Sequence, residues 1–180
     1  MRETARARTP GSAHQGRHRR TGSRLLGVVL LVGVLALVGV VRVFVVEPFY
    51  VPTPSMSPTV PSGAHAFASK LAYRFGAPQR GDIVVLQSPR DQNQLLVKRV
   101  VGLAGQRVEV RDGVLLVDRV RQRESYVDYR RVDSTFFGPV TVPPHHVFVM
   151  GDNRANSVDS RVFGAVPESA LLGKVFAHVG

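Results

Sequence analysis

The chain has 180 residues, 44% of them hydrophobic, which fits one compact domain with a terminal extension. Cysteine is absent, which excludes disulfides, cysteine nucleophiles and cysteine-ligated metals. The net charge is +11, and residues 1–24 contribute +6 of it through seven Arg and one Glu. A basic end of this kind suits nucleic acid or an anionic membrane face, and the segment that follows decides between them.

The N-terminal part of the sequence predicts a tail and a membrane anchor. Residues 1–23 hold almost nothing apolar that is larger than Ala, so we predict a disordered basic cytoplasmic tail. Residues 25–41 carry no charge, and a helix extended through Val46 would be roughly 33 Å long, enough for the hydrocarbon layer. We therefore predict a transmembrane helix over 24–46. Residues expected at its outer interface are Phe44, Phe49 and Tyr50.

A cleaved secretory signal peptide is the alternative interpretation of this segment. The bulky residues 43–50 argue against it, because the cleavage site of a secretory signal needs small residues. Arginines before the helix predict a cytoplasmic N-terminus by the positive-inside rule. Residues 47–180 would then lie on the extracytoplasmic side of the cell membrane, which excludes nucleic acid as a partner.

Beyond the apolar segment, short runs of Val, Ile, Leu and Phe alternate with Gly- and Pro-rich turns, which predicts short strands. Asp112-Gly113 between two runs predicts a β-hairpin. No amphipathic soluble helix is indicated. We therefore expect residues 47–180 to form a mainly β, compact, antiparallel sheet or barrel-like domain. The expected strands cover 67–72, 82–87, 95–102, 107–110, 114–120, 146–151 and 172–178.

Three segments carry residues suited to chemistry. In residues 52–59, three prolines predict a rigid loop that would hold the Ser55 hydroxyl in one orientation. The alternative is a stiff linker whose hydroxyls serve solubility. In residues 96–105, strand alternation turns Lys98 and Arg99 to opposite faces, so one cation can be buried. A buried lysine has a lowered pKa and can accept a proton from a serine. The alternative is a lysine on an edge strand whose charged amine extends into solvent.

The third segment, residues 151–161, follows an apolar strand and packs two acids, two arginines, two amides and two serines into a short loop. Such a loop can satisfy itself through Asp–Arg pairs and Asx turns and so form a fixed platform beside a site. A solvated polar turn is the alternative.

Taken in this order behind one N-terminal anchor, the segments resemble the type I signal peptidases (leader peptidases), a bacterial family of serine proteases with a Ser-Lys dyad. The family patterns are P-S-x-S-M-x-P-T, G-D-(I/V)-V-V, Y-(V/I)-K-R-V-(V/I/A)-G-L-P-G and G-D-N-R-x-N-S-x-D-S-R. They match residues 52–59, 81–85, 96–105 and 151–161. The chain departs from them with Thr53 in place of Ser, Leu96 in place of Tyr and Ala104 in place of Pro.

The resemblance implies a role for each matching residue. Ser55 would be the nucleophile, Lys98 the general base, Thr53 an oxyanion donor together with the Ser55 amide, and Ser157 the group that orients the lysine. Substrate contacts would come from Met56 and Leu96. Residues that would hold the architecture through ion pairs are Asp152, Asp159 and Arg161, with Arg99 and Arg154.

The resemblance also implies a function: a single-pass, membrane-bound endopeptidase that removes signal peptides from exported precursor proteins at A-x-A-like sites. Its partners would be these precursors and the lipid bilayer, and no metal or cofactor is expected. Alternatives are a self-cleaving repressor or a pilin-type peptidase with the same dyad, and a tethered β domain that binds peptides without turnover. A further alternative is a cationic surface around Arg119, Arg121 and Arg123 that contacts anionic lipid.

Overall fold

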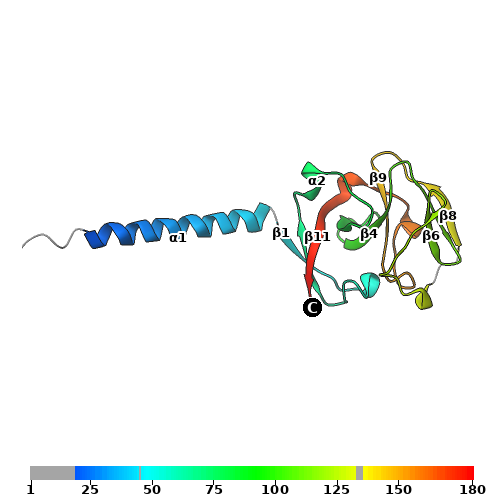
Figure 1. The fold of residues 1–180 in the computed structure, drawn as a ribbon, viewed down its shortest axis with the longest axis horizontal. Coiled ribbons are helices and arrows are strands. Elements are labelled where there is room, and N and C mark those ends of the chain that lie inside the picture. Colours follow the sequence, from blue (N-terminus) through cyan, green and yellow to red (C-terminus); the bar gives the residue numbers. More distant parts are fainter. Residues whose placement is uncertain (1–18, 45, 133–135) are drawn as a thin grey trace, which may run out of the picture. The chain divides into compact units, whose positions relative to one another are not determined.

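The protein is described from a computed structural model that covers residues 19–44, 46–132 and 136–180. The chain forms two units, which divide between residues 40 and 41. The first contains most of helix α1 (Arg19–Phe44), whose residues 24–40 are all exposed (Figure 1). No helix in the described part of the chain is both long and apolar enough to cross a membrane.

The structure differs from the sequence expectations at three points in this region. Residues 19–23 belong to α1 rather than to a disordered tail, while residues 1–18 lie outside the described residues. Val46 begins strand β1 (Val46–Tyr50), because residues 46–50 pair with β2 (His65–Ser69). Phe49 is consequently part of a hydrophobic core, 8% exposed, and not part of an aromatic belt at a membrane.

The second unit contains two antiparallel sheets, which confirms the mainly β class. The larger sheet has seven strands in the order β1-β2-β11-β3-β4-β9-β10, and the smaller has four in the order β7-β6-β5-β8. In Figure 1, β1 and β11 lie at one end of this domain and β6 and β8 at the other. The remaining strands are β3 (Ile83–Gln87), β4 (Leu95–Leu103), β5 (Arg107–Arg111), β6 (Val114–Val117), β7 (Val120–Arg121), β8 (Phe136–Thr141), β9 (His146–Met150), β10 (Val166–Pro167) and β11 (Leu171–Val179).

Short helices connect some of the strands. Two of them, α2 (Ala72–Phe75) and α3 (Ser160–Phe163), have four residues each, too few for an amphipathic pattern to show in sequence. Single 3₁₀ turns are η1 (Pro54–Met56), η2 (Tyr129–Arg131) and η3 (Glu168–Ala170).

Tight turns set the register of the smaller sheet. Asp112 and Gly113 have φ of 48° and 75° between the paired strands β5 and β6, as expected for a two-residue hairpin. Asp118 and Arg119 repeat this left-handed geometry, with φ of 52° and 68°, and divide the run 114–120 into β6 and β7. The single strand predicted there is therefore a second hairpin.

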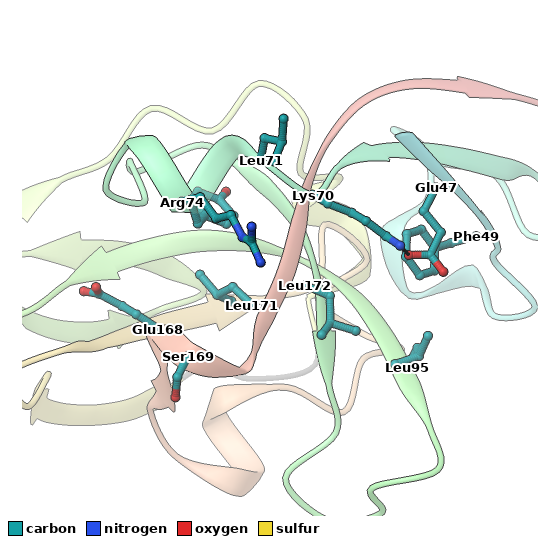
Figure 2. Close-up of a pocket in the computed structure, with 11 residues that line it drawn as sticks. Glu47, Phe49, Lys70, Leu71, Arg74, Leu95, Glu168, Ser169, Leu171 and Leu172 are labelled. Carbon is teal, nitrogen blue, oxygen red and sulfur yellow. Dashed lines mark ion pairs between the residues drawn. The ribbon is translucent and has the colours of Figure 1, made fainter. Parts of the chain in front are cut away.

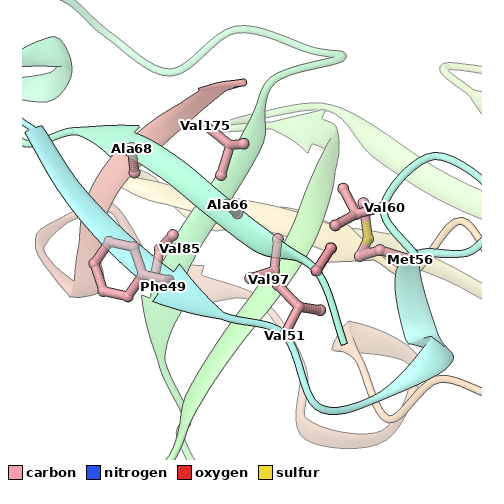
Figure 3. Close-up of a cluster of buried hydrophobic side chains, with 10 residues drawn as sticks. Phe49, Val51, Met56, Val60, Ala66, Ala68, Val85, Val97 and Val175 are labelled. Atoms are coloured by element: carbon pink, nitrogen blue, oxygen red, sulfur yellow. The ribbon is translucent and has the colours of Figure 1, made fainter. Parts of the chain in front are cut away.

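One hydrophobic cluster holds the two segments that matter most for chemistry. Met56 and Val60, which follow Ser55, are fully buried beside Val97, which precedes Lys98 (Figure 3). Burial of each such side chain contributes about 1.5–3 kcal/mol. The same core therefore fixes η1 against β4 and determines how Ser55 and Lys98 face each other. Its members are Phe49, Val51, Met56, Val60, Ala64, Ala66, Ala68, Val85, Val97 and Val175.

Candidate active site

Ser55 lies in η1, a single 3₁₀ turn that is fixed at both ends. Thr53 precedes the turn in an extended conformation, and the backbone N–H of Ser57 donates to Pro54 O at 3.0 Å. The N–H of Val60 then donates to Met56 O at 2.9 Å. Ser55 itself is 6% exposed. Its hydroxyl is thus held in one place by a rigid, partly buried loop.

Lys98 in β4 is the residue that meets Ser55. Its Nζ donates to Ser55 Oγ at 2.7 Å, across 43 residues of sequence, and the lysine is only 2% exposed. Burial disfavours the charged amine and lowers the pKa of Lys98 to about 8, although Asp159 and Asp152 act in the opposite direction. A substantial fraction of the amine is therefore neutral near pH 8 and can accept the serine proton.

Thr53 brings a second hydroxyl to the same point. Its Oγ1 lies 3.2 Å from Ser55 Oγ. The N–H of Ser55 belongs to the first turn of η1, where amides have no partner within the helix. A hydroxyl and an amide are thus close to the position where an oxyanion would form.

Ser157 lies beside the dyad, but no hydrogen bond to Lys98 is present. Its Oγ is buried and makes no hydrogen bond with the described residues. A Cβ added at Gly151 would lie 2.5 Å from both Ser157 Cβ and Ser55 O, so the polar loop passes directly against the serine turn. The N–H of Asn153 also donates to Ser55 O, at 3.1 Å. The orienting role of Ser157 stays a prediction.

Arg99 ties β4 to the polar loop on the far side of the strand from Lys98. Its Nε and Nη2 donate to the two carboxylate oxygens of Asp152 at 2.8 and 2.7 Å, and Asp152 is fully buried. Its Nη1 donates to Gly81 O at 2.8 Å. Bidentate pairs of this kind fix both position and direction, so the loop and the strand keep one register.

Asp159 and Arg161 close the other end of the loop. Arg161 Nε and Nη2 donate to the Asp159 carboxylate at 2.9 and 3.0 Å. Asp159 Oδ2 also accepts a hydrogen bond from the N–H of Gly151 at 2.9 Å. Arg161 Nη2 also donates to Arg154 O at 2.9 Å. Within the loop, Asp159 and Arg161 form the predicted kind of Asp–Arg pair, whereas Asp152 pairs with Arg99 of β4 instead.

Glu124 is a residue that the sequence does not single out. It forms a bidentate pair with Arg154, at 2.9 and 2.6 Å, and both side chains are almost fully buried. Arg154 Nε donates to Gly151 O, and Tyr126 OH donates to Glu124 Oε1 at 2.9 Å. The ring of Tyr126 in turn stacks on the guanidinium of Arg99 at 3.9 Å. Residues 124–126 thus connect to both sides of the polar loop.

A pocket of about 310 Å³ opens beside the dyad. Leu96 lines it, as expected for a substrate contact, whereas Met56 is fully buried in the core and could shape the pocket only from behind. The lining residues are Thr53, Ser55, Ser88, Arg90, Gln94, Leu96, Lys98, Asn156 and Val158. The described residues contain no group of three or more His, Asp or Glu that could hold a metal.

A larger pocket of about 830 Å³ lies elsewhere and contains none of the predicted site residues (Figure 2). Leu95, Leu171 and Leu172 give it an apolar floor, and the ion pair between Lys70 and Glu47 borders it at 2.9 Å. It has no nucleophile paired with a base, so the smaller pocket is the candidate active site.

Comparisons with known proteins identify the family of the chain. A family model described as signal peptidase, peptidase S26 matches residues 24–179. A probable signal peptidase I-1 from Synechocystis is 39% identical over 126 residues, which cover 66% of this chain and 63% of that protein. A mitochondrial ATP-independent inner membrane protease subunit 1b from Arabidopsis thaliana is also 39% identical over 126 residues, or 69% of this chain and 64% of that protein.

A solved structure gives the same result for the fold. The crystal structure of a signal peptidase I from Enterococcus faecalis V583 superposes with a TM-score of 0.50 and 35% identity, over 56% of this chain and 98% of that one. The chain spans less than two thirds of the length of the first curated relatives that it matches. Because the family model covers most of the sequence, the chain belongs to the signal peptidase family, peptidase S26.

Proposed function

We propose that the chain is a serine endopeptidase of the signal peptidase I type, which removes signal peptides from exported precursor proteins. The observation that carries this proposal is the buried contact of 2.7 Å between Lys98 Nζ and Ser55 Oγ. An amine with a pKa of about 8 in direct contact with a serine hydroxyl is an activated nucleophile–base pair. The names of the relatives support the same reaction.

In the proposed mechanism, Lys98 Nζ takes the proton from Ser55 Oγ as the oxygen attacks the scissile carbonyl. The hydroxyl of Thr53 and the N–H of Ser55 donate to the resulting oxyanion. Each donor lowers the activation free energy by a few kcal/mol. When the C–N bond breaks, Lys98 returns the proton to the leaving amine. Lys98 Nζ, neutral again, then takes a proton from a water molecule as the water attacks the acyl-enzyme. It gives that proton to Ser55 Oγ when the ester bond breaks and the new carboxylate leaves.

The preferred substrates in this proposal carry small residues such as Ala immediately before the cut and two residues further back. In this proposal, the residues before the cut bind in the pocket of about 310 Å³ that Leu96 and Val158 share with the dyad, and the preference for small residues rests on the chain's membership of the signal peptidase family.

Mass-spectrometric mapping of a precursor incubated with the detergent-solubilised full chain tests the function. We expect one cut after an A-x-A-like sequence, and no cut by Ser55→Ala or Lys98→Met. Substantial turnover by either folded variant would remove that residue from its role. Equal binding of intact precursor by the wild type and Ser55→Ala, without any cut, would support a binding protein instead.

The oxyanion assignment has a separate test. Thr53→Ser keeps the hydroxyl 3.2 Å from Ser55 Oγ, whereas Thr53→Val removes it at nearly constant volume. We expect kcat to fall by about 10²–10³ in Thr53→Val and far less in Thr53→Ser. Equal activity of the two variants would exclude Thr53 as a donor.

We further propose that the protein acts at the cell membrane, anchored once through its N-terminal apolar segment, with its catalytic domain on the extracytoplasmic side. The uncharged run 25–41, the preceding arginines and a relative named as an inner membrane protease support this location. Resistance to alkaline extraction, together with protease access to residues 47–180 only from outside, is the expected result. Release of the intact chain at high pH would contradict it.

A further inference from the structure

The connection between β3 and β4 forms one wall of the active-site pocket. Ser88, Arg90 and Gln94 of this connection line the same pocket as Ser55 and Lys98. None of these three residues belongs to the segments that match the family patterns, so the wall is a feature of this chain that the motifs do not describe.

Hydrogen bonds within the connection fix its backbone. Ser88 Oγ, on a residue only 4% exposed, accepts from the N–H groups of Arg90 and Asp91, both at 3.3 Å. The N–H of Gln94 donates to Asp91 O, and the N–H of Ser88 donates to Gln94 O, both at 2.9 Å. Because β4 begins at Leu95 and carries Lys98, this loop holds the Arg90 backbone in a constant place relative to the dyad.

The charge of Arg90 is available to a ligand. Arg90 is exposed and forms no ion pair with an acid of the described residues. The neighbouring carboxylate of Asp91 accepts from the N–H of Asn93 at 2.9 Å. Among the described residues, no Asp or Glu lines the pocket, and Arg90 and Lys98 are the only charged residues that do. The wall therefore contributes an exposed arginine that has no counter-charge among the described residues of the pocket.

We propose that Arg90 determines specificity by binding an aspartate or glutamate side chain of the precursor close to the scissile bond. A guanidinium matches a carboxylate with two parallel hydrogen bonds, and a neutral or cationic side chain cannot use that geometry. This inference rests on the proposed peptidase function and adds a class of substrate to it.

The expected effect is modest because Arg90 is exposed and its charge is screened. Exposed ion pairs change binding by a small factor, which here corresponds to about a two- to fivefold preference in kcat/KM for Glu over Gln. Since the contact exists before and during the reaction, it acts mainly on KM. High salt reduces it.

The experiment uses the full chain in detergent and a set of peptides with one A-x-A site. Each peptide carries Glu, Gln or Lys at one position within three residues of the cut. The two positions before the cut that must be small are left as Ala. The ratio of kcat/KM for Glu to that for Gln is measured within each enzyme, so general losses of activity cancel. The enzymes are the wild type, Arg90→Gln, Arg90→Glu and the control Arg74→Gln, an exposed arginine of the larger pocket.

We expect a Glu preference at one or two positions in the wild type and in Arg74→Gln, a ratio near one in Arg90→Gln, and a preference for Lys in Arg90→Glu. Cleavage of all peptides with equal kcat/KM would overturn the inference and leave the peptidase function intact. The same Glu preference in Arg90→Gln would also overturn it. Failure of the wild type to cut any peptide would overturn the proposed function together with this inference.

Discussion

Replacing Lys98 with Met should stabilise the fold while it removes the proposed base. The chain folds with this amine 2% exposed, and its pKa falls from an ordinary 10.5 to about 8. At 1.36 kcal/mol per pKa unit, the buried lysine costs the folded state roughly 3 kcal/mol at pH 7. The hydrogen bond to Ser55 offsets about 1 kcal/mol of this cost. Met fills a similar volume without charge, so we expect a net gain of about 2 kcal/mol.

The sign of the pH dependence follows from proton binding. Between about pH 8 and 10.5 the unfolded chain holds a proton on Lys98 that the folded chain has lost, so wild-type stability rises with pH across this window. The cost is therefore complete below pH 8 and falls below about 1 kcal/mol by pH 10. The advantage of Lys98→Met should be largest at pH 7 and absent near pH 10.

Chemical denaturation of the full chain in detergent, at pH 7 and pH 10, measures both quantities. Lys70→Met is the matched control, because Lys70 is 40% exposed in a surface ion pair with Glu47 and should change stability by no more than about 1 kcal/mol. A Lys98→Met variant that is less stable than the wild type at pH 7, or whose difference does not change with pH, would refute the reasoning.

Three further predictions concern the rate, the ion pairs and the polar loop. First, kcat/KM should rise about tenfold between pH 7 and pH 9, following the neutral fraction of Lys98, and a rise centred above pH 10 would contradict the lowered pKa. Second, Glu124→Ala should lower the unfolding free energy by about 3–5 kcal/mol, because it leaves Arg154 buried and unpaired, whereas Glu47→Ala at the surface should cost less than about 1 kcal/mol in the same denaturation assay. Third, Gly151→Ala should reduce peptide cleavage at least tenfold, because the added Cβ would contact Ser157 Oγ and lie 2.5 Å from Ser55 O. Gly33→Ala is the control and should retain wild-type cleavage, because the space around its added Cβ is open.

Local signals in the sequence predict the parts of the fold that depend on local physics. The Asp112-Gly113 hairpin is predictable because glycine accepts positive φ without strain. Asp118-Arg119 adopts the same turn, but arginine is rarely found at positive φ, so no sequence signal marks it. Strand β8 contains Pro139, which normally argues against a strand, and it is tolerated because β8 lies at the edge of its sheet.

Tertiary context decides what the sequence could not show. The aromatic Phe49 follows an apolar segment and has the pattern of a membrane interface, yet it is buried because β1 pairs with β2. Glu124 is one acid among several in its region, and its pairing with Arg154 joins residues 30 positions apart. Ser157 is found by its motif, but a motif gives no hydrogen-bond partner.

The pairing of the neighbouring acids with arginines explains why Lys98 in β4 can lose its charge beside a loop with two buried carboxylates. Asp152 and Asp159 would each hold a proton on the lysine if their charges were uncompensated, and both do raise its pKa. Each, however, already binds its own guanidinium through two hydrogen bonds, Asp152 with Arg99 and Asp159 with Arg161. Desolvation is then the larger effect, and the adjacent cations Lys98 and Arg99 separate: the arginine keeps its charge in a pair, and the lysine becomes available as a base.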